Sequence, residues 1–482
     1  MNRREFVKRA AAASASAALV SAAAAAPRKS TGKQPNVLYV FSDQHRAASL
    51  PGETLSPVIA PALAKFRREN LSMDTCVSNY PLCAPHRAIL ISGLYSNQSH
   101  ITTNGQTLEP IVPGLGETFQ KAGYHTGYVG KWHLYNGENV FVPKGPYRFG
   151  FEDWHAWADT NQHYNGITFD QETGVRMTMP GYQPTRMTDQ AIEFINKQKG
   201  SDQPWFLVLS WNPPHPPFDP PAEERDLYGP SSLQFRPNVR LSAPADKLQL
   251  PYPQLESFDT LRKAEQGYYG GITAVDKEFA RLLETLNENG IADDTIIVYT
   301  SDHGEMMGSH GHMAKQMPHE ESCRVPFLVR VPGMKSPGRR SDALFASIDI
   351  YPTLCGLAGI PIPKHCSGRD FSDRMRGDSS LPSPEMVFLM NDQGPMPRQE
   401  IDVPTYRGLR TRTHTYAVQL DGRWCLYDNV ADPYQMKNLV RDPATKALIE
   451  KFDTALIEWS KSTGDSFPYD KVLGSYSSYP SV

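Results

Sequence analysis

Five short runs of apolar, largely β-branched or aromatic residues are spread along the chain. They occupy residues 36–42, 124–130, 205–211, 295–301 and 325–331. Runs of this kind are typical of parallel strands that are buried on both faces. Apolar positions recur with helical spacing at residues 60–70, 114–123, 187–198 and 272–290. Strands that alternate with helices predict an α/β fold in which helices sandwich a large, mostly parallel sheet.

The pattern changes in the last quarter of the chain. Residues 406–429 predict antiparallel strands, with the dipeptide Asp421-Gly422 as the hairpin turn. Residues 442–462 predict one long amphipathic helix. We therefore expect a main domain over residues 35–375 and a smaller C-terminal α+β subdomain over residues 376–482.

A proline-rich stretch interrupts the alternation of strands and helices. Residues 204–253 contain twelve prolines, which remove backbone donors and exclude regular structure throughout the stretch. We expect a long loop there, lying over one edge of the sheet.

The first residues have the pattern of an export signal. Arg3 and Arg4 precede a weakly apolar, Ala-rich run over residues 10–26, as in a twin-arginine signal peptide. The run is too short and too rich in serine to span a bilayer stably. The competing interpretation is an Ala-rich surface helix. The favoured one predicts cleavage after Ala25, export of the folded protein by the twin-arginine machinery, and a periplasmic or secreted bacterial protein.

The amino-acid composition excludes only a few classes of binding partner. A net charge of −3 with 39% hydrophobic residues is ordinary for a globular protein and argues against nucleic acid or a membrane surface as partner. Six cysteines are too few for a disulfide scaffold. An oxidising destination would permit a bridge, with the pairing left open, among Cys76, Cys323, Cys355, Cys366 and Cys425.

Polar residues follow directly on four of the five apolar runs. They are Asp43, Gln44 and His45; Lys131 and His133; His215; and Asp302 and His303. In open α/β sheets ligands bind beyond the carboxyl ends of the strands. We therefore expect these residues to converge on one site.

Two of these groups have the composition of a metal site. Asp43 with Gln44, and Asp302 with His303, offer two carboxylates and two neutral donors. Mostly oxygen donors suit Ca²⁺ or Mg²⁺, while a histidine also leaves room for Mn²⁺ or Zn²⁺. The alternative is that Asp43 and Asp302 each cap a helix.

Cys83 is a candidate nucleophile. Pro85 suits the first turn of a helix, which would place the thiol of Cys83 at the positive end of the helix and lower its pKa. A buried structural cysteine is the commoner alternative.

The residues around Cys83 carry a recognisable motif. Residues 83–87 read Cys-x-Pro-x-Arg and are followed by "AILISGLY". This resembles the signature of the type I sulfatases of the alkaline phosphatase superfamily. Four further blocks resemble that family in the right order, at residues 35–46, 123–134, 301–333 and 426–439. Five blocks in order are far more specific than one motif.

The resemblance implies a modified nucleophile and a metal. In this family a formylglycine-generating enzyme reads the motif on the unfolded chain and oxidises the cysteine, here Cys83, to formylglycine. The cation, usually Ca²⁺, would be held by Asp43, Gln44, Asp302, His303 and the modified Cys83. This chain departs from the family by having Gln44 where an acidic residue is common, His303 where asparagine is frequent, and His86 where serine or alanine is common.

The resemblance also assigns catalytic roles. Arg87 and Lys131 would hold the hydrated aldehyde, one oxygen of which attacks sulfur while the metal and Lys315 neutralise the sulfate oxygens. His215 would protonate the leaving alcohol. His133 would take a proton from the second diol oxygen, so that sulfate is expelled and the aldehyde is regenerated.

The expected activity is removal of sulfate from a sulfated carbohydrate. Candidate substrate residues are His310, His163 and Arg398. Two interpretations stay open for an aromatic stretch, which could stack on sugar rings or simply form a packed loop: Trp154, His155, Trp157 and Tyr164. Likewise, Arg398 and Arg407 could bind neighbouring sulfates or carboxylates of the substrate, or could form surface ion pairs. A phosphonate monoester or phosphodiester hydrolase is the nearest alternative function. A non-catalytic sulfated-glycan-binding protein is the third, and the complete catalytic set argues against it.

Overall fold

The computed structural model describes most of the chain beyond the predicted export signal. The described residues are 34–136, 140–158, 161–229, 231, 233–241, 257–334, 338–378, 382–392 and 404–478. Residues 1–26 and Arg398 lie outside them. The chain divides into one unit over residues 1–34 and a second over residues 35–482, and the fold is that of the second.

The large sheet confirms the predicted α/β class. Within the described residues it has the strand order β12-β2-β11-β9-β1-β8-β4-β5. The central strands β9, β1, β8, β4 and β5 are all parallel. The strands are β1 (Asn36–Asp43), β2 (Leu71–Met73), β4 (His125–Lys131), β5 (Asp153–Trp157), β8 (Trp205–Pro214), β9 (Thr295–Ser301), β11 (Phe327–Arg330) and β12 (Arg340–Ser341).

One of the five predicted strands was assigned the wrong direction. Residues 325–331 were expected to be parallel, but β11 pairs antiparallel with both β9 and β2. A parallel connection needs a crossover, usually a helix. The connection from β9 to β11 contains only the short helix α9 (Glu320–Cys323) and the two-residue strand β10 (Arg324–Val325), so the chain turns back beside β9.

Side chains of the central strand β1 alternate between two helical layers. Val37, Tyr39 and Phe41 pack with residues of one set of helices, and Leu38 and Val40 pack with residues of another, as the two-residue period of a strand requires. The first set is α3 (Cys83–Ser92), α5 (Leu115–Lys121) and α10 (Ser347–Ala358), and the second is α2 (Pro61–Glu69), α6 (Gln183–Lys197) and α8 (Phe258–Glu288). The sheet is therefore covered on both faces, as predicted.

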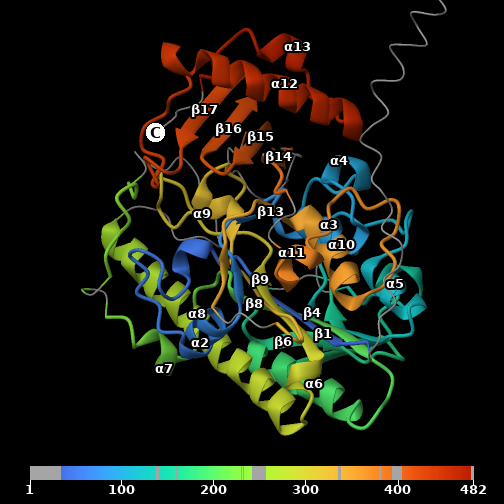
Figure 1. Ribbon diagram of the computed structural model, residues 1–482. Coiled ribbons are helices and arrows are strands. Elements are labelled where there is room, and N and C mark those ends of the chain that lie inside the picture. The colour runs from blue at the N-terminus through green and yellow to red at the C-terminus, as the bar shows by residue number, and fades with distance from the viewer. Residues whose placement is uncertain are drawn as a thin grey trace, which may run out of the picture. The chain divides into compact units, whose positions relative to one another are not determined.

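A four-stranded antiparallel sheet, with the order β14-β15-β16-β17, forms the C-terminal part. Helix α12 lies along it (Figure 1). Pairing of Gln419 with Gly422 places Leu420 and Asp421 in the turn, one residue earlier than predicted. Gly422 is instead needed where residue 475 approaches closely, since a Cβ there would lie 2.7 Å from Ser475. The elements are β14 (Met386–Asn391), β15 (Tyr406–Thr411), β16 (His414–Gln419), β17 (Gly422–Asp428) and α12 (Lys446–Thr463).

Short elements complete the fold. They are β3 (Cys76–Val77), β6 (Tyr164–Phe169), β7 (Arg176–Tyr182), β13 (Phe345–Ala346), α4 (Ser96–Ser99), α7 (Ala222–Arg225), α11 (Ser372–Arg376), α13 (Tyr469–Val472), η1 (Ala47–Ser49), η2 (Pro146–Arg148), η4 (Ala292–Asp294) and η5 (Pro443–Thr445). All six cysteines are free thiols. No helix in the described ranges combines the length and apolarity that crossing a membrane requires.

In its first described part, the proline-rich segment continues β8 and then lies against helix α8, and not over a sheet edge as predicted. Residues 205–214 form the central strand β8, and Phe218, Pro220 and Arg225 after it pack on glycines of α8. The backbone oxygen of Phe218 lies so close that a Cβ on Gly267 would be 2.1 Å away. Glycine at this position of α8 therefore lets the segment that carries His215 sit directly on the helix.

This packing predicts opposite effects for two alanine substitutions in α8. Gly267→Ala would force a Cβ against the Phe218 backbone and should lower the free energy of unfolding by about 1–3 kcal/mol. Gly271→Ala is the matched control, because its nearest neighbours, atoms of Pro214, would be at an ordinary 3.4 Å. It should be neutral, or stabilising by up to about 1 kcal/mol through helix propensity. Urea denaturation of both variants measures the difference, and equal stabilities would contradict the packing.

Candidate active site

The polar residues that follow the parallel strands meet at the carboxyl edge of the sheet. Asp43 ends β1 and Lys131 ends β4, and the Lys131 ammonium donates to Asp43 Oδ2 over 2.9 Å. Asp302 and His303 follow β9, and His303 Nε2 lies 3.5 Å from Asp43 Oδ1. Three strands that lie far apart in the sequence, β1, β4 and β9, thus contribute to one cluster.

Cys83 enters this cluster as the first residue of α3. Its side chain is 1% exposed, and its Sγ lies 3.2 Å from His303 Nε2 and 3.6 Å from Asp43 Oδ1. Lys131 Nζ is 3.9 Å from the same sulfur. The Asn104 side chain accepts the N–H of the next residue, Ala84, over 3.0 Å. The start of the helix therefore aims the thiol at the buried carboxylates.

Arg87, one helical turn after Cys83, ties the carboxylates together. Its Nη2 lies 3.0 Å from Asp302 Oδ2 and 3.3 Å from Asp43 Oδ2. Its Nη1 donates to the backbone oxygen of Lys131 and to Ser210 Oγ. The guanidinium is 1% exposed and is thus fixed by partners from β1, β4, β8 and the loop after β9.

The donor atoms around Cys83 fit a metal ion. One ligand atom each from Asp43, Cys83, Asp302 and His303 lie within 4.8 Å of one another. His303 Nδ1 donates to the Gly304 carbonyl over 3.0 Å, which leaves the Nε2 lone pair directed at the carboxylates, as a metal ligand requires. The helix-capping alternative is wrong: Asp302 Oδ1 accepts the N–H groups of His303 and Gln44 in a loop, and the residue before η1 is Arg46.

Charge at the site is balanced before any cation binds. Asp43 and Asp302 face Arg87 and Lys131, all of them at most 1% exposed. Burial is the largest single influence on Asp43 and raises its pKa, but the nearby positive charges, with Lys131 foremost, together outweigh it and hold the pKa of Asp43 well below its usual range. Burial also lowers the pKa of His303, which keeps the imidazole neutral. A divalent cation would therefore give the site a net positive charge, which favours an anionic substrate.

A second chain of polar contacts starts at Gln44. Its Oε1 accepts from Lys315 Nζ over 2.6 Å, and Lys315 Nζ lies 3.1 Å from His215 Nε2. His215 Nδ1 donates to the Pro216 carbonyl over 2.7 Å. His215 Nε2 is therefore the acceptor, and burial and Lys315 lower the pKa of His215 well below its usual value. A proton held here is shared between Lys315 and His215.

The remaining predicted catalytic residue lies at the same edge. His133 follows Lys131 by two residues, has left-handed backbone (φ 59°) and is 5% exposed. Its N–H bonds to the Ala158 carbonyl. His86 is buried on α3, and its Nδ1 lies 3.1 Å from Ser78 Oγ.

The two predicted substrate residues that the structure describes, His310 and His163, have different neighbours. His310 stacks on His319 with ring centroids 4.2 Å apart, and His163 Nδ1 lies 2.7 Å from Asp219 Oδ1. Trp154 and Trp157 belong to β5 and their side chains are buried, which supports a role in packing over stacking on sugar rings. Arg407 forms ion pairs with Asp465 and Asp392.

Three residues in contact with the site were missed from the sequence. Glu305 lies beside Gln44, Asn161 Oδ1 accepts from Lys131 Nζ over 3.2 Å, and Ser210 contacts Arg87. Glu305 is two residues after His303 and Ser210 is near the end of an apolar run, so proximity to the predicted residues was a signal for both. Asn161 follows no pattern that would have singled it out.

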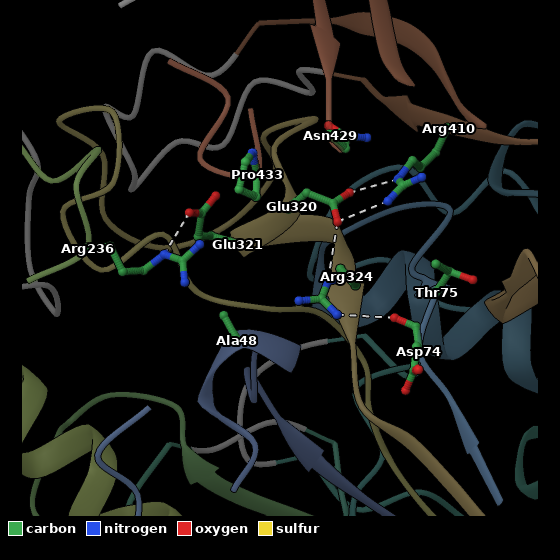
Figure 2. Close-up of a pocket in the computed structure, with 10 residues that line it drawn as sticks. All are labelled: Ala48, Asp74, Thr75, Arg236, Glu320, Glu321, Arg324, Arg410, Asn429 and Pro433. Atoms are coloured by element: carbon green, nitrogen blue, oxygen red, sulfur yellow. Dashed lines mark hydrogen bonds and ion pairs between the residues drawn. The ribbon is translucent and has the colours of Figure 1, made fainter. Parts of the chain in front are cut away.

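A charged pocket of about 250 Å³ lies between η1, α9 and the C-terminal sheet (Figure 2). Arg236 pairs with Glu321, and Arg324 and Arg410 both pair with Glu320. None of the predicted catalytic or metal-binding residues lines it. Its arginines are already matched by carboxylates, so it joins α9 to neighbouring segments and offers no unpaired charge to a ligand.

A buried thiol beside carboxylates and an imidazole that could hold a metal ion, at the carboxyl edge of an α/β sheet, fits the class of metal-assisted ester hydrolases. Residues 35–360 match the sulfatase family, and residues 308–462 match the C-terminal region of N-sulphoglucosamine sulphohydrolase. The chain belongs to the sulfatase family and is a sulfuric ester hydrolase, which confirms the predicted type I sulfatase. The family implies a formylglycine and a metal site, for which the geometry around Cys83 is suited.

Individual relatives agree with the family. An ulvan-active sulfatase of Formosa agariphila is 33% identical over 90% of this chain and 82% of its own. An endo-4-O-sulfatase of Bacteroides thetaiotaomicron is 28% identical over 92% of this chain and 94% of its own. A crystal structure of a Bacteroides fragilis protein assigned as the sulfatase YidJ superposes with a TM-score of 0.80 at 27% identity, and covers 92% of this chain and 99% of that one.

The donor set predicts how the binding of a divalent cation depends on Asp302, with Ca²⁺ as the probe. Asp302→Asn retains an oxygen for the N–H groups of His303 and Gln44 but removes the charge, and Ca²⁺ affinity should fall about 100-fold or more because ligand charge sets it. Asp276→Asn is the matched control, since Asp276 is equally buried and also accepts two backbone N–H groups, those of Ala62 and Leu63. Calorimetric titration with Ca²⁺ compares them, and equal affinity in both variants would remove Asp302 from the site.

Proposed function

We propose that this protein removes sulfate from a sulfated carbohydrate, with Cys83 acting after its conversion to formylglycine. The observation that carries the proposal is the position of Cys83 Sγ, at the start of α3 and within 4 Å of Asp43, His303 and Lys131. The matched relatives are named for activity on ulvan and for an endo-acting 4-O-sulfatase. The first name supports a carbohydrate substrate, and the second supports a sulfate that is bound through oxygen.

Two groups supplied by maturation complete the site. The hydrated aldehyde of formylglycine supplies the nucleophilic oxygen, and a bound cation, which we propose to be Ca²⁺, supplies Lewis-acid stabilisation of the sulfate oxygens. Asp43, Gln44, Asp302 and His303 would hold the cation. We propose that a formylglycine-generating enzyme modifies Cys83 in the cytoplasm, and that residues 1–26 direct the folded product through the twin-arginine pathway to the periplasm or the exterior.

The chain's own residues then position charge and move protons. Arg87 and Lys131 flank residue 83 and orient it by charge-assisted hydrogen bonds. Lys315 neutralises a sulfate oxygen, and the proton that it shares with His215 Nε2 passes to the oxygen of the leaving sugar alcohol. His133, beyond Lys131 on the same strand end, accepts the proton that must leave residue 83 for sulfate to be released.

Sulfate release separates this function from phosphorus chemistry. Purified protein is assayed with a panel of sulfated carbohydrates and with 4-nitrophenyl sulfate, in parallel with a phosphodiester and a phosphonate monoester. We expect kcat/KM to be highest for a sulfate ester. Higher kcat/KM for the phosphorus substrates would overturn the proposal in favour of a phosphonate or phosphodiester hydrolase, and binding without turnover would favour a glycan-binding protein.

If residue 83 is a formylglycine nucleophile, two results follow: a change in the mass of the peptide that contains it, and loss of activity when it is replaced. The peptide that contains Cys83 should weigh about 18 Da less than its thiol form, or appear as the hydrate of that species. Cys83→Ala should abolish turnover of every sulfate ester at a stability cost of no more than about 1–2 kcal/mol. An unmodified thiol in a fully active preparation would show that Cys83 acts as a cysteine or not at all.

The Lys315–His215 pair predicts a dependence on the leaving group. A sugar alkoxide needs a proton in the transition state, whereas nitrophenolate leaves without one. His215→Ala should therefore lose about 10²- to 10⁴-fold in kcat on a carbohydrate sulfate and far less on 4-nitrophenyl sulfate. Equal losses on the two substrates would assign His215 to sulfate binding and leave Lys315 as the proton donor.

A further inference from the structure

Glu305 is a completely buried carboxylate to which no catalytic role has been assigned. It follows His303 by two residues in the loop after β9. Its Oε1 accepts the backbone N–H of Met307 over 2.8 Å and that of Ala314 over 2.7 Å. Its Oε2 forms a short hydrogen bond with the side-chain Nε2 of Gln44. Both oxygens are thus used, one on the backbone of its own loop and one on a proposed metal ligand.

The chemistry of these partners fixes the orientation of the Gln44 amide. Burial raises the pKa of Glu305, but both of its oxygens act as acceptors, Oε1 for two backbone N–H groups and Oε2 for the NH₂ of Gln44, which is the pattern of a carboxylate. An ammonium only donates, so Gln44 must turn Oε1 toward Lys315, which lies 2.6 Å away. The flip that satisfies Glu305 also satisfies Lys315, and it directs the amide oxygen, the atom that a hard cation prefers, away from Glu305.

Glu305 also fixes the loop that delivers Lys315. Ala314, whose N–H it accepts, directly precedes Lys315. The loop contains several residues with left-handed backbone, which are Met307, Gly308, His310, Gly311, Ala314 and Gln316. Such conformations persist only where surrounding contacts determine them. The bonds from Met307 and Ala314 to one carboxylate close the base of this loop.

We propose that Glu305 is a positioning residue that sets the orientation of the Gln44 amide, and through it the placement of both the cation and Lys315. The inference rests on the proposed function for its catalytic consequence, but its effect on the Gln44 amide does not depend on any substrate. In the "SDHGE" segment, Glu305 would thus influence the positions of the metal and the sulfate without contacting either.

A single isosteric substitution tests the polarity of the contact. In Glu305→Gln the new side-chain oxygen can still accept from Met307 and Ala314, so the loop keeps its anchors. The new NH₂ would face the NH₂ of Gln44, and the Gln44 amide would have to flip and present its NH₂ to Lys315. We expect Ca²⁺ affinity to fall about 10- to 100-fold, as for lost partners of metal ligands, and kcat on a sulfate ester to fall with it.

Exchange of the two groups is the decisive variant. Gln44→Glu alone would set two carboxylates against each other, which opposes the gain in affinity that a charged ligand would otherwise bring. The double variant Glu305→Gln/Gln44→Glu restores one donor and one acceptor at the contact, still offers an acceptor to Lys315, and leaves the net charge unchanged. We expect it to regain at least about tenfold of the affinity lost in Glu305→Gln.

The cycle of four proteins is measured on the full-length matured chain, by calorimetric titration with Ca²⁺ and by kcat and KM on a sulfate ester. Non-additive recovery of either quantity in the double variant supports the proposal. Wild-type values in Glu305→Gln, or a double variant as impaired as the sum of the single ones, would overturn it. If the wild-type chain binds Ca²⁺ and shows the cycle but hydrolyses no sulfate ester, the proposed function fails while the role of Glu305 stands.

Discussion

Two fully buried carboxylates at one edge of the sheet set the main constraint on this structure. Asp43 and Asp302 are both 0% exposed, and desolvation of each charge costs several kcal/mol unless it is compensated. Compensation comes from Arg87 on α3 and Lys131 at the end of β4. The positions of β1 and β4 in the sheet and of the start of α3 must therefore be fixed to within a hydrogen-bond length. Because Cys83 is the first residue of α3, the same requirement places it beside the carboxylates.

The same constraint explains why the site suits an anion. Four buried charges cancel, so the fold is electrostatically stable without a ligand. A divalent cation adds two positive charges at a point where Lys315 already lies nearby, on the other side of Gln44. A sulfate ester would then enter a positive, dehydrated environment, where electrostatic stabilisation of a transition state is most effective. Burial and Lys315 lower the pKa of His215, so the imidazole is neutral and the shared proton at its Nε2 comes from Lys315.

The sequence was sufficient for the central strands and for the residues around the nucleophile, because both depend on local patterns. Apolar runs mark β1, β4, β8 and β9, and the Cys-x-Pro-x-Arg motif marks Cys83 and Arg87. It could not show the direction of β11, since an apolar run has no signal for strand direction. The sequence also could not predict hydrogen bonds between residues that are far apart in the chain. The contact of Lys315 with His215, for example, depends on which imidazole nitrogen faces the lysine. The substrate residues were the weakest part, because packing and not residue type decides whether Trp154 or Arg407 is available.

The loop between β9 and β11 shows how distant parts of the chain shape the site without touching the nucleophile. Near its start it is anchored by Glu305 to Gln44. Beside Lys315, the Gln316 side chain donates to Asn391 at the end of β14 over 3.0 Å. At α9, Glu320 forms a two-pronged ion pair with Arg410 of β15. Two of these three anchors belong to the C-terminal sheet. The C-terminal part therefore supports the loop that carries Lys315, and a substitution there could displace Lys315 while leaving the proposed metal ligands in place.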